Sequence, residues 1–158
     1  MLLSFKDWNC TFGWNAVDCE NKIVDSMYKN WAPFNIGFSS VDSLATSYTL
    51  FFTNDSPGSW GLSDVSVGAA PVLCEGSAGG AGIVFCGKQG EVYCANVASH
   101  ELGHLLGLDH VNDPKDYMSW EYRGPIGFRD TVLPTVNGAC RGEQNSKQEL
   151  LKKLGPRR

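Results

Sequence analysis

All three histidines of the chain lie within residues 100–110, which read His-Glu-Leu-Gly-His-Leu-Leu-Gly-Leu-Asp-His. His100 and His104 are four positions apart, a spacing that places both rings on one face of a helix, one turn apart. His110 lies too far along the axis to join them if that helix continued. Gly107 resolves the conflict, because glycine adopts the left-handed conformation in which a helix ends and the chain turns back. The run therefore predicts a helix that ends near residue 107 and a third histidine that returns toward the first two.

Three imidazoles gathered in this way form a ligand set for one zinc ion, which takes ring nitrogens at about 2.0–2.1 Å. Three protein ligands leave a fourth position open to water, as in catalytic rather than structural zinc sites. Glu101 follows the first histidine, and from there its carboxylate can reach that water without binding the metal. Zinc lowers the pKa of its water to about 7, so Glu101 is the candidate general base for attack on a peptide carbonyl. The pattern H-E-x-x-H-x-x-G-x-x-H is a signature of zinc peptidases.

Composition indicates one globular domain spanning residues 1–158, because 42% hydrophobic and 19% charged residues are ordinary values for a folded chain. A net charge of −4 without a basic stripe argues against a nucleic-acid partner. No apolar run approaches the roughly 20 residues that span a bilayer. The apolar start, residues 1–5, is too short for a signal-peptide core, so we expect a secretion signal outside this sequence or another route of export.

The cysteines are even in number and include no C-x-x-C pair: Cys10, Cys19, Cys74, Cys86, Cys94 and Cys140. Such usage favours disulfides in an oxidising compartment over a cysteine metal site, so we expect a secreted, extracellular protein. Six cysteines allow 15 pairings, and the sequence leaves all of them open.

Hydrophobic spacing predicts helices and strands on either side of the histidine run. An apolar face at helical spacing, closed by a proline, predicts a first helix, and Ser146 with Glu149 forms a capping box that opens a last one. Gly68 lies in an expected strand and would admit close approach of another group. The expected helices span 21–32, 92–106 and 146–154, and the expected strands span 34–38, 48–53, 65–73 and 83–85.

The histidine run resembles that of the metzincin clan of zinc endopeptidases, which also have a methionine on a tight turn beneath the metal. Met118 stands eight residues after His110 and matches this Met-turn. Within the clan the spacing is most similar to that of the matrixins, the matrix metalloproteinases. They commonly have proline and methionine at the fourth and eighth positions after the third histidine, matched by Pro114 and Met118. They also have a tyrosine four residues later, matched by Tyr122, in the wall of the pocket for the side chain just past the cleaved bond.

Other parts of the sequence depart from the matrixin pattern. No histidine remains for the second, structural zinc of that family, and its Asp-Gly-rich calcium loops are not evident, although Asp55 and Asp64 leave a weaker calcium site open. Trp120 replaces the tyrosine ligand of astacins and serralysins. The segment 68–74 and the placement of the cysteines are similar to those of adamalysins, whereas Val111 replaces the aspartate typical of that family.

The resemblance implies an α+β metzincin-like zincin fold: a twisted mixed β-sheet, an N-terminal helix, the active-site helix and a C-terminal helix. It also implies a monomer that cleaves proteins or peptides, with substrate added as a strand beside an edge strand near 66–72. A second hypothesis remains open, in which the chain is a zinc-bearing protein-binding or toxin-like domain with little proteolytic activity. A third is a structural metal protein, which a fourth protein ligand would support.

Overall fold

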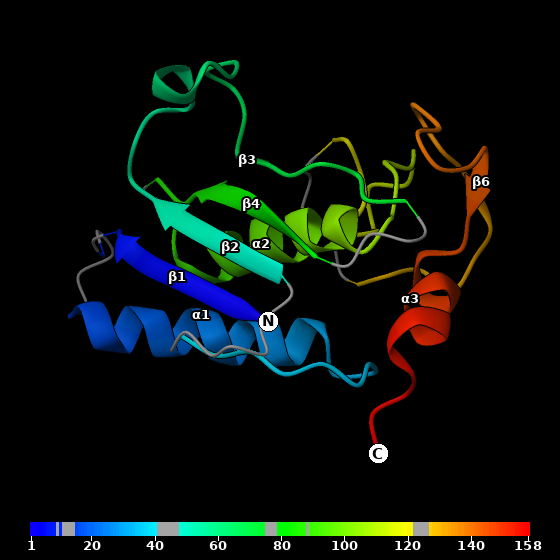
Figure 1. The fold of residues 1–158 in the computed structure, drawn as a ribbon, viewed down its shortest axis with the longest axis horizontal. Coiled ribbons are helices and arrows are strands. Elements are labelled where there is room, and N and C mark those ends of the chain that lie inside the picture. The colour runs from blue at the N-terminus through cyan, green and yellow to red at the C-terminus, as the bar shows by residue number, and fades with distance from the viewer. Residues whose placement is uncertain (9, 11–14, 41–47, 75–78, 88, 122–126) are drawn as a thin grey trace.

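A four-stranded mixed sheet lies at the centre of the computed structural model (Figure 1), in the order β1-β2-β4-β3. The first three strands in this order run parallel, and β3 pairs antiparallel with β4 at one edge. The strands are β1 (Leu2–Asp7), β2 (Tyr48–Thr53), β3 (Gly68–Ala69) and β4 (Gly80–Phe85). The structure describes the whole chain except residues 9, 11–14, 41–47, 75–78, 88 and 122–126.

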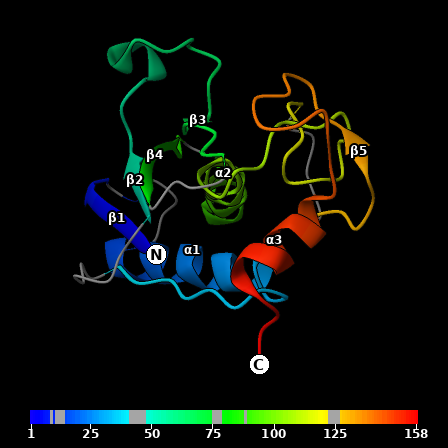
Figure 2. The ribbon, with the colours of Figure 1, turned by 45° about the vertical axis from the view of Figure 1, so that its right-hand side comes forward.

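Two long helices, α1 (Ala16–Asn30) and α2 (Glu91–Leu105), lie on the same side of this sheet (Figures 1 and 2). Asn15 caps α1 by accepting a hydrogen bond from the backbone of Asp18 at 2.9 Å. The helix buries Ile23 and Met27, as the apolar spacing predicted. α2 is buried along most of its length because it lies between α1, the sheet and the chain that follows it.

Apolar side chains from the sheet and both helices form one core. Phe5, Trp8 and Phe52 stack together at the end of the parallel strands, with ring centroids of Phe5 and Phe52 4.5 Å apart. Such burial is worth about 1.5–3 kcal/mol for each large side chain. The core therefore fixes α2 against β4, and with it the position of every residue that α2 carries.

The chain after α2 has little regular structure and ends in α3 (Figure 2). Its only strands among the described residues are a two-residue antiparallel pair. Asn145 caps α3, accepting from the backbone of Gln148 at 2.9 Å, and Gly155 ends the helix at a φ of 77°. The remaining elements are η1 (Pro57–Trp60), β5 (Leu133–Pro134), β6 (Glu143–Gln144) and α3 (Ser146–Leu154).

Three disulfides account for all six cysteines. Cys10–Cys19 ties the end of β1 to α1, and Cys86–Cys94 ties the end of β4 to α2. Cys74–Cys140 spans 66 positions and joins the segment after β3 to the chain before α3. The expectation of a disulfide framework is met, with two local bridges and one long-range bridge.

The α+β fold and its mixed sheet agree with the expectation, while several element assignments need correction. The predicted strand at 34–38 is wrong: Phe34 makes only an isolated bridge, to Pro156, and its ring packs against Trp31. The alternation there reflects aromatic packing, not a ladder. The strand expected at 65–73 pairs with β4 only at Gly68 and Ala69, opposite Val84 and Ile83.

Two further differences concern the ends of the chain. β1 was not predicted from the short apolar start of the chain, because it pairs with β2, more than 40 positions away. The predicted capping box is also wrong. Asn145 is the cap, Ser146 is buried, and Glu149 forms ion pairs with Arg141 and Lys152.

Candidate metal centre

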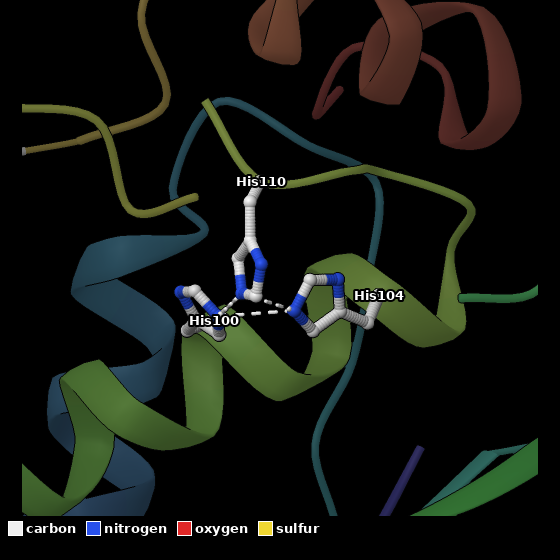
Figure 3. A group of neighbouring side chains, drawn as sticks. All are labelled: His100, His104 and His110. Carbon is white, nitrogen blue, oxygen red and sulfur yellow. Dashed lines mark hydrogen bonds between the residues drawn. The ribbon is translucent and has the colours of Figure 1, made fainter. Parts of the chain in front are cut away.

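The three histidines come together from two parts of the chain, as Figure 3 shows. His100 and His104 lie one turn apart on α2, and His110 reaches them from the segment that follows. α2 ends at Leu105, and Gly107 has a φ of 86°. A Cβ there would lie 2.8 Å from the carbonyl oxygen of Leu73. Both the backbone conformation and the lack of space require glycine at this reversal, as the sequence predicted.

The Nε2 atoms of the three rings converge, at separations of 3.0, 3.0 and 3.1 Å. On the other side of two rings, Nδ1 of His100 lies 2.6 Å from the carbonyl oxygen of Tyr117, and Nδ1 of His104 lies 2.8 Å from that of Leu108. A carbonyl only accepts, so each of these Nδ1 atoms carries the proton and each Nε2 presents a lone pair. Imidazole nitrogens that converge in this way could hold a cation.

The electrostatics favour the neutral form of all three rings. Burial, followed by the neighbouring histidines, lowers the pKa of His100 well below its ordinary value. Burial likewise lowers the pKa of His104 to about 4 and lowers that of His110. Neutral imidazole is the form that ligates a metal. Within the described residues, these three histidines form the group of potential ligands able to hold a metal ion, and they fit zinc by donor type and number.

Glu101 points into the same cleft and is almost fully buried. Its carboxyl lies against Gly68 of the edge strand, where a Cβ would come within 2.8 Å of Cγ and Cδ of Glu101. Burial raises the pKa of this carboxyl to about 8. The close approach expected at Gly68 is thus made by the side chain that the sequence singled out as a base.

A cleft of about 350 Å³ opens over the histidines. Residues 65–70, which include the edge strand β3, form one wall. Ser119 and the half-exposed Trp120 also line the cleft, together with His110. The arrangement offers an edge strand, a cation site and a buried carboxyl along one groove.

Met118 is completely buried beneath the histidine helix. Its sulfur and methyl group occupy the space where Gly103 has no side chain, and a Cβ there would lie 3.1 Å from the methionine Cε. The backbone of Met118 donates to Asp116 Oδ1 at 2.8 Å, and its carbonyl accepts from Val111 at 2.9 Å. The structure therefore brings Met118 directly under the residues that carry the site.

The remaining predicted residues are not part of the described site. Tyr122 lies outside the described residues. Asp55 accepts from the Trp60 indole at 3.1 Å, and neither it nor Asp64 belongs to a described group of three potential metal ligands.

Four residues that shape the site were missed by sequence reasoning. Gly103 had a usable signal, because an isolated glycine inside a helix usually has a packing reason. Asp116 accepts from the backbone two residues on, a local turn pattern typical of Asp. Asp109 and Gln144 are paired over 35 positions and gave no local signal.

In the part of the chain that the structure describes, no helix has both the length and the hydropathy needed to cross a membrane. Compared with known families, the chain matches the matrixin family model over residues 15–134. No curated protein matches it.

Proposed function

This chain belongs to the matrixin family, and on that premise we propose that it is a zinc-dependent endopeptidase acting on proteins or peptides. The family supports a metallopeptidase in general. The observation that carries the proposal is the convergence of the Nε2 nitrogens of three histidines beside a buried carboxyl in one cleft. His100, His104 and His110 would hold one zinc ion through Nε2.

Bound there, zinc supplies a Lewis acid that polarises the scissile carbonyl and makes water a stronger acid. Glu101 acts on the attacking water as general base, taking one proton as the oxygen bonds to the carbonyl carbon. It then gives that proton to the amine nitrogen as the C–N bond breaks. An adjacent dication favours the ionised form of this carboxylate, which opposes the effect of its burial. Gly68 leaves the room in which the Glu101 carboxyl sits.

The edge of the sheet supports an extended mode of substrate binding. β3 pairs with β4 on one side, while its residues also line the cleft. We propose that a peptide lies along β3 as an added strand, so that backbone hydrogen bonds supply affinity. We further propose a preference for substrates with an apolar side chain just past the cleaved bond. This rests on the match of Tyr122 to the tyrosine in the wall of that pocket in matrixins.

Met118 would support the ligands from below without binding the metal. Its complete burial against Gly103 favours that role. The three disulfides favour an oxidising, extracellular location. We further propose that the protein acts as a monomer.

Cleavage of a broad peptide library, with zinc and with a chelator, tests the proposal. Glu101→Ala should lower chelator-sensitive cleavage by about 10²–10⁴-fold, the usual contribution of a general base. Glu91→Ala is the matched control: Glu91 lies in the first turn of the same helix, is half-buried and pairs with Lys22. It should leave cleavage within about twofold, since ion pairs of this exposure contribute little.

Two results would contradict the proposal. In one, the wild-type protein shows no metal-dependent cleavage, which would favour the zinc-bearing binding or toxin-like domain. In the other, Glu101→Ala retains wild-type cleavage, which would remove Glu101 from the chemistry.

A further inference from the structure

The third histidine is held differently from the other two. His100 and His104 stand on α2, and the Nδ1 of each ring donates to a backbone carbonyl. His110 stands on irregular chain beyond Gly107. Among the described residues no carbonyl accepts from its Nδ1. Its place at the site must therefore come from the backbone that carries it.

That backbone is bound on both sides of His110. The carbonyl of His110 accepts from the backbone of Val136 at 2.8 Å, and the next residue, Val111, donates to Met118 at 2.9 Å. The preceding residue, Asp109, is 1% exposed. Its carboxylate accepts from the backbone of Ala139 at 2.8 Å and of Cys140 at 3.0 Å.

Gln144 completes the arrangement from the end of β6. Its side-chain amide makes two reciprocal bonds with the backbone of Asp109: Oε1 accepts from the Asp109 N–H, and Nε2 donates to the Asp109 carbonyl, both at 2.8 Å. Gln144 is 2% exposed, so water cannot replace these bonds. Both carboxylate oxygens of Asp109 and both polar atoms of the Gln144 amide are thus hydrogen-bonded, and together these bonds fix the backbone just before His110.

A disulfide and a backbone hydrogen bond together link this arrangement to the histidine helix. Cys140, whose backbone bonds Asp109, is joined to Cys74. The neighbouring Leu73 donates its backbone N–H to the carbonyl of His104 at 2.9 Å. A closed path therefore runs from His104 through the disulfide to the residue beside His110. All the partners of Asp109 in this path lie beyond residue 134, where the family match ends.

We propose that Asp109 and Gln144 are positioning residues that hold His110 at the metal centre, using chain outside the matched matrixin region. The inference rests on the proposed zinc site. The two residues act through the His110 backbone and touch neither substrate nor metal. Loss of either should weaken zinc binding by about 10–100-fold, the usual effect of residues that orient a metal ligand.

The test is zinc affinity, measured on the full chain by competition with a chromophoric chelator. Gln144→Met removes both amide bonds at similar volume, and Asp109→Asn keeps one acceptor oxygen. Both should raise the zinc Kd about 10–100-fold, with Asp109→Ala more severe than Asp109→Asn. The matched controls are Gln148→Met and Asp130→Asn. These two exposed side chains form a 2.9 Å hydrogen bond with each other and do not bond the His110 segment. Their zinc Kd should stay within about twofold of wild type.

A His110→Ala background separates positioning from general structural support. If the two residues act through His110, Gln144→Met should change the zinc Kd by less than about twofold once His110 is gone. The cobalt-substituted protein gives a second readout, since loss of a third imidazole changes its visible absorption. If Asp109 and Gln144 had only a structural role, their loss would lower the melting temperature of the metal-free protein. The zinc Kd and the visible absorption of the cobalt protein would then stay unchanged.

The outcomes distinguish this inference from the proposed function. If the wild-type protein binds zinc, and Gln144→Met and Asp109→Asn have the same zinc Kd as the control variants, the positioning role is overturned and the peptidase proposal stands. Equal weakening with and without His110 would do the same. Failure of the wild-type protein to bind zinc would overturn both.

Discussion

The two regions that meet at the histidines are stabilised in different ways. In the sheet–helix region, residues 2–106, large apolar side chains from strands and helices share one core. The return region, residues 108–146, adds a few apolar side chains to that core, and its buried polar side chains also bond individual backbone groups. Asp116 is an example: it is fully buried and accepts from the backbones of Met118 and Arg129 at 2.8 and 3.0 Å.

This difference determines how each region responds to substitution. An apolar core tolerates volume-conserving changes, which usually cost less than about 1.5 kcal/mol. A buried polar group left without its partner costs about 1–3 kcal/mol. Because His100 and His104 belong to the first region and His110 to the second, the site depends on both kinds of stabilisation.

Removing the covalent link between the regions should have the largest effect on stability. Loop-entropy arguments give about 4 kcal/mol for a bridge that spans 66 positions and about 2.5 kcal/mol for one that spans 8. We expect Cys74→Ala/Cys140→Ala to lower the free energy of unfolding by the larger amount in chemical denaturation. Cys86→Ala/Cys94→Ala, within the first region, is the comparison. A smaller loss of unfolding free energy on removing Cys74–Cys140 than on removing Cys86–Cys94 would contradict the idea that the long-range bridge holds the two regions together.

An isosteric change in each region tests the comparison directly. Asp116→Asn replaces one of the two acceptor oxygens by an N–H₂ donor that faces a backbone N–H, and should cost about 1.5–3 kcal/mol, the value of hydrogen bonds to a charged group. Leu50→Met, at a fully buried position in β2, should cost less than about 1.5 kcal/mol. Urea midpoints of the two variants measure this. A reversed order would show that the polar region is not the more sensitive one.

Gly103 tests the contact between the regions. Glycine to alanine inside a helix ordinarily stabilises by about 1 kcal/mol. Here the new methyl would collide with Met118, so overpacking of about 1–3 kcal/mol should reverse the sign. Thermal unfolding of Gly103→Ala should therefore occur at a lower temperature than that of wild type. A rise in melting temperature would show that Met118 moves aside freely.

The smallest change in stability is expected at Gly68, accompanied by a loss of activity. Gly68→Ala would displace the Glu101 carboxyl, and a misplacement near 1 Å can cost about 10²-fold in rate. Gly37→Ala, where an added Cβ meets nothing within 4 Å, is the control. Peptide cleavage and melting temperature should be measured on both. Unchanged cleavage by Gly68→Ala would show that Glu101 does not depend on this contact.

The difference between the sheet–helix region and the return region also explains which parts of the structure could be predicted from the sequence. Apolar periodicity, together with a stop at proline or glycine, located α1, α2, β2 and α3 to within a few residues at most ends. The histidine spacing and Gly107 predicted the convergence of the three rings. These signals are local and repeat along the chain, so a single sequence is enough to show them.

The return region could not be predicted in this way. Asp109 meets Gln144 over 35 positions, and Asp116 meets Arg129 over 13. Each contact depends on one polar side chain meeting one backbone group, which leaves no periodic pattern. β1 was missed for a related reason, because its partner β2 lies more than 40 positions away. The sequence therefore predicted that the three histidines meet, and not what holds the third one in place.

Amide hydrogen exchange of the metal-free protein, before and after addition of one equivalent of zinc, tests the central claim most directly. If zinc binds all three histidines, it ties the return region to the sheet–helix region and stabilises the state in which both are folded. We expect slower exchange mainly at residues 109–111 and 136–144 and at Met118, with little change in α1. No change anywhere, or an equal change in both regions, would contradict the claim.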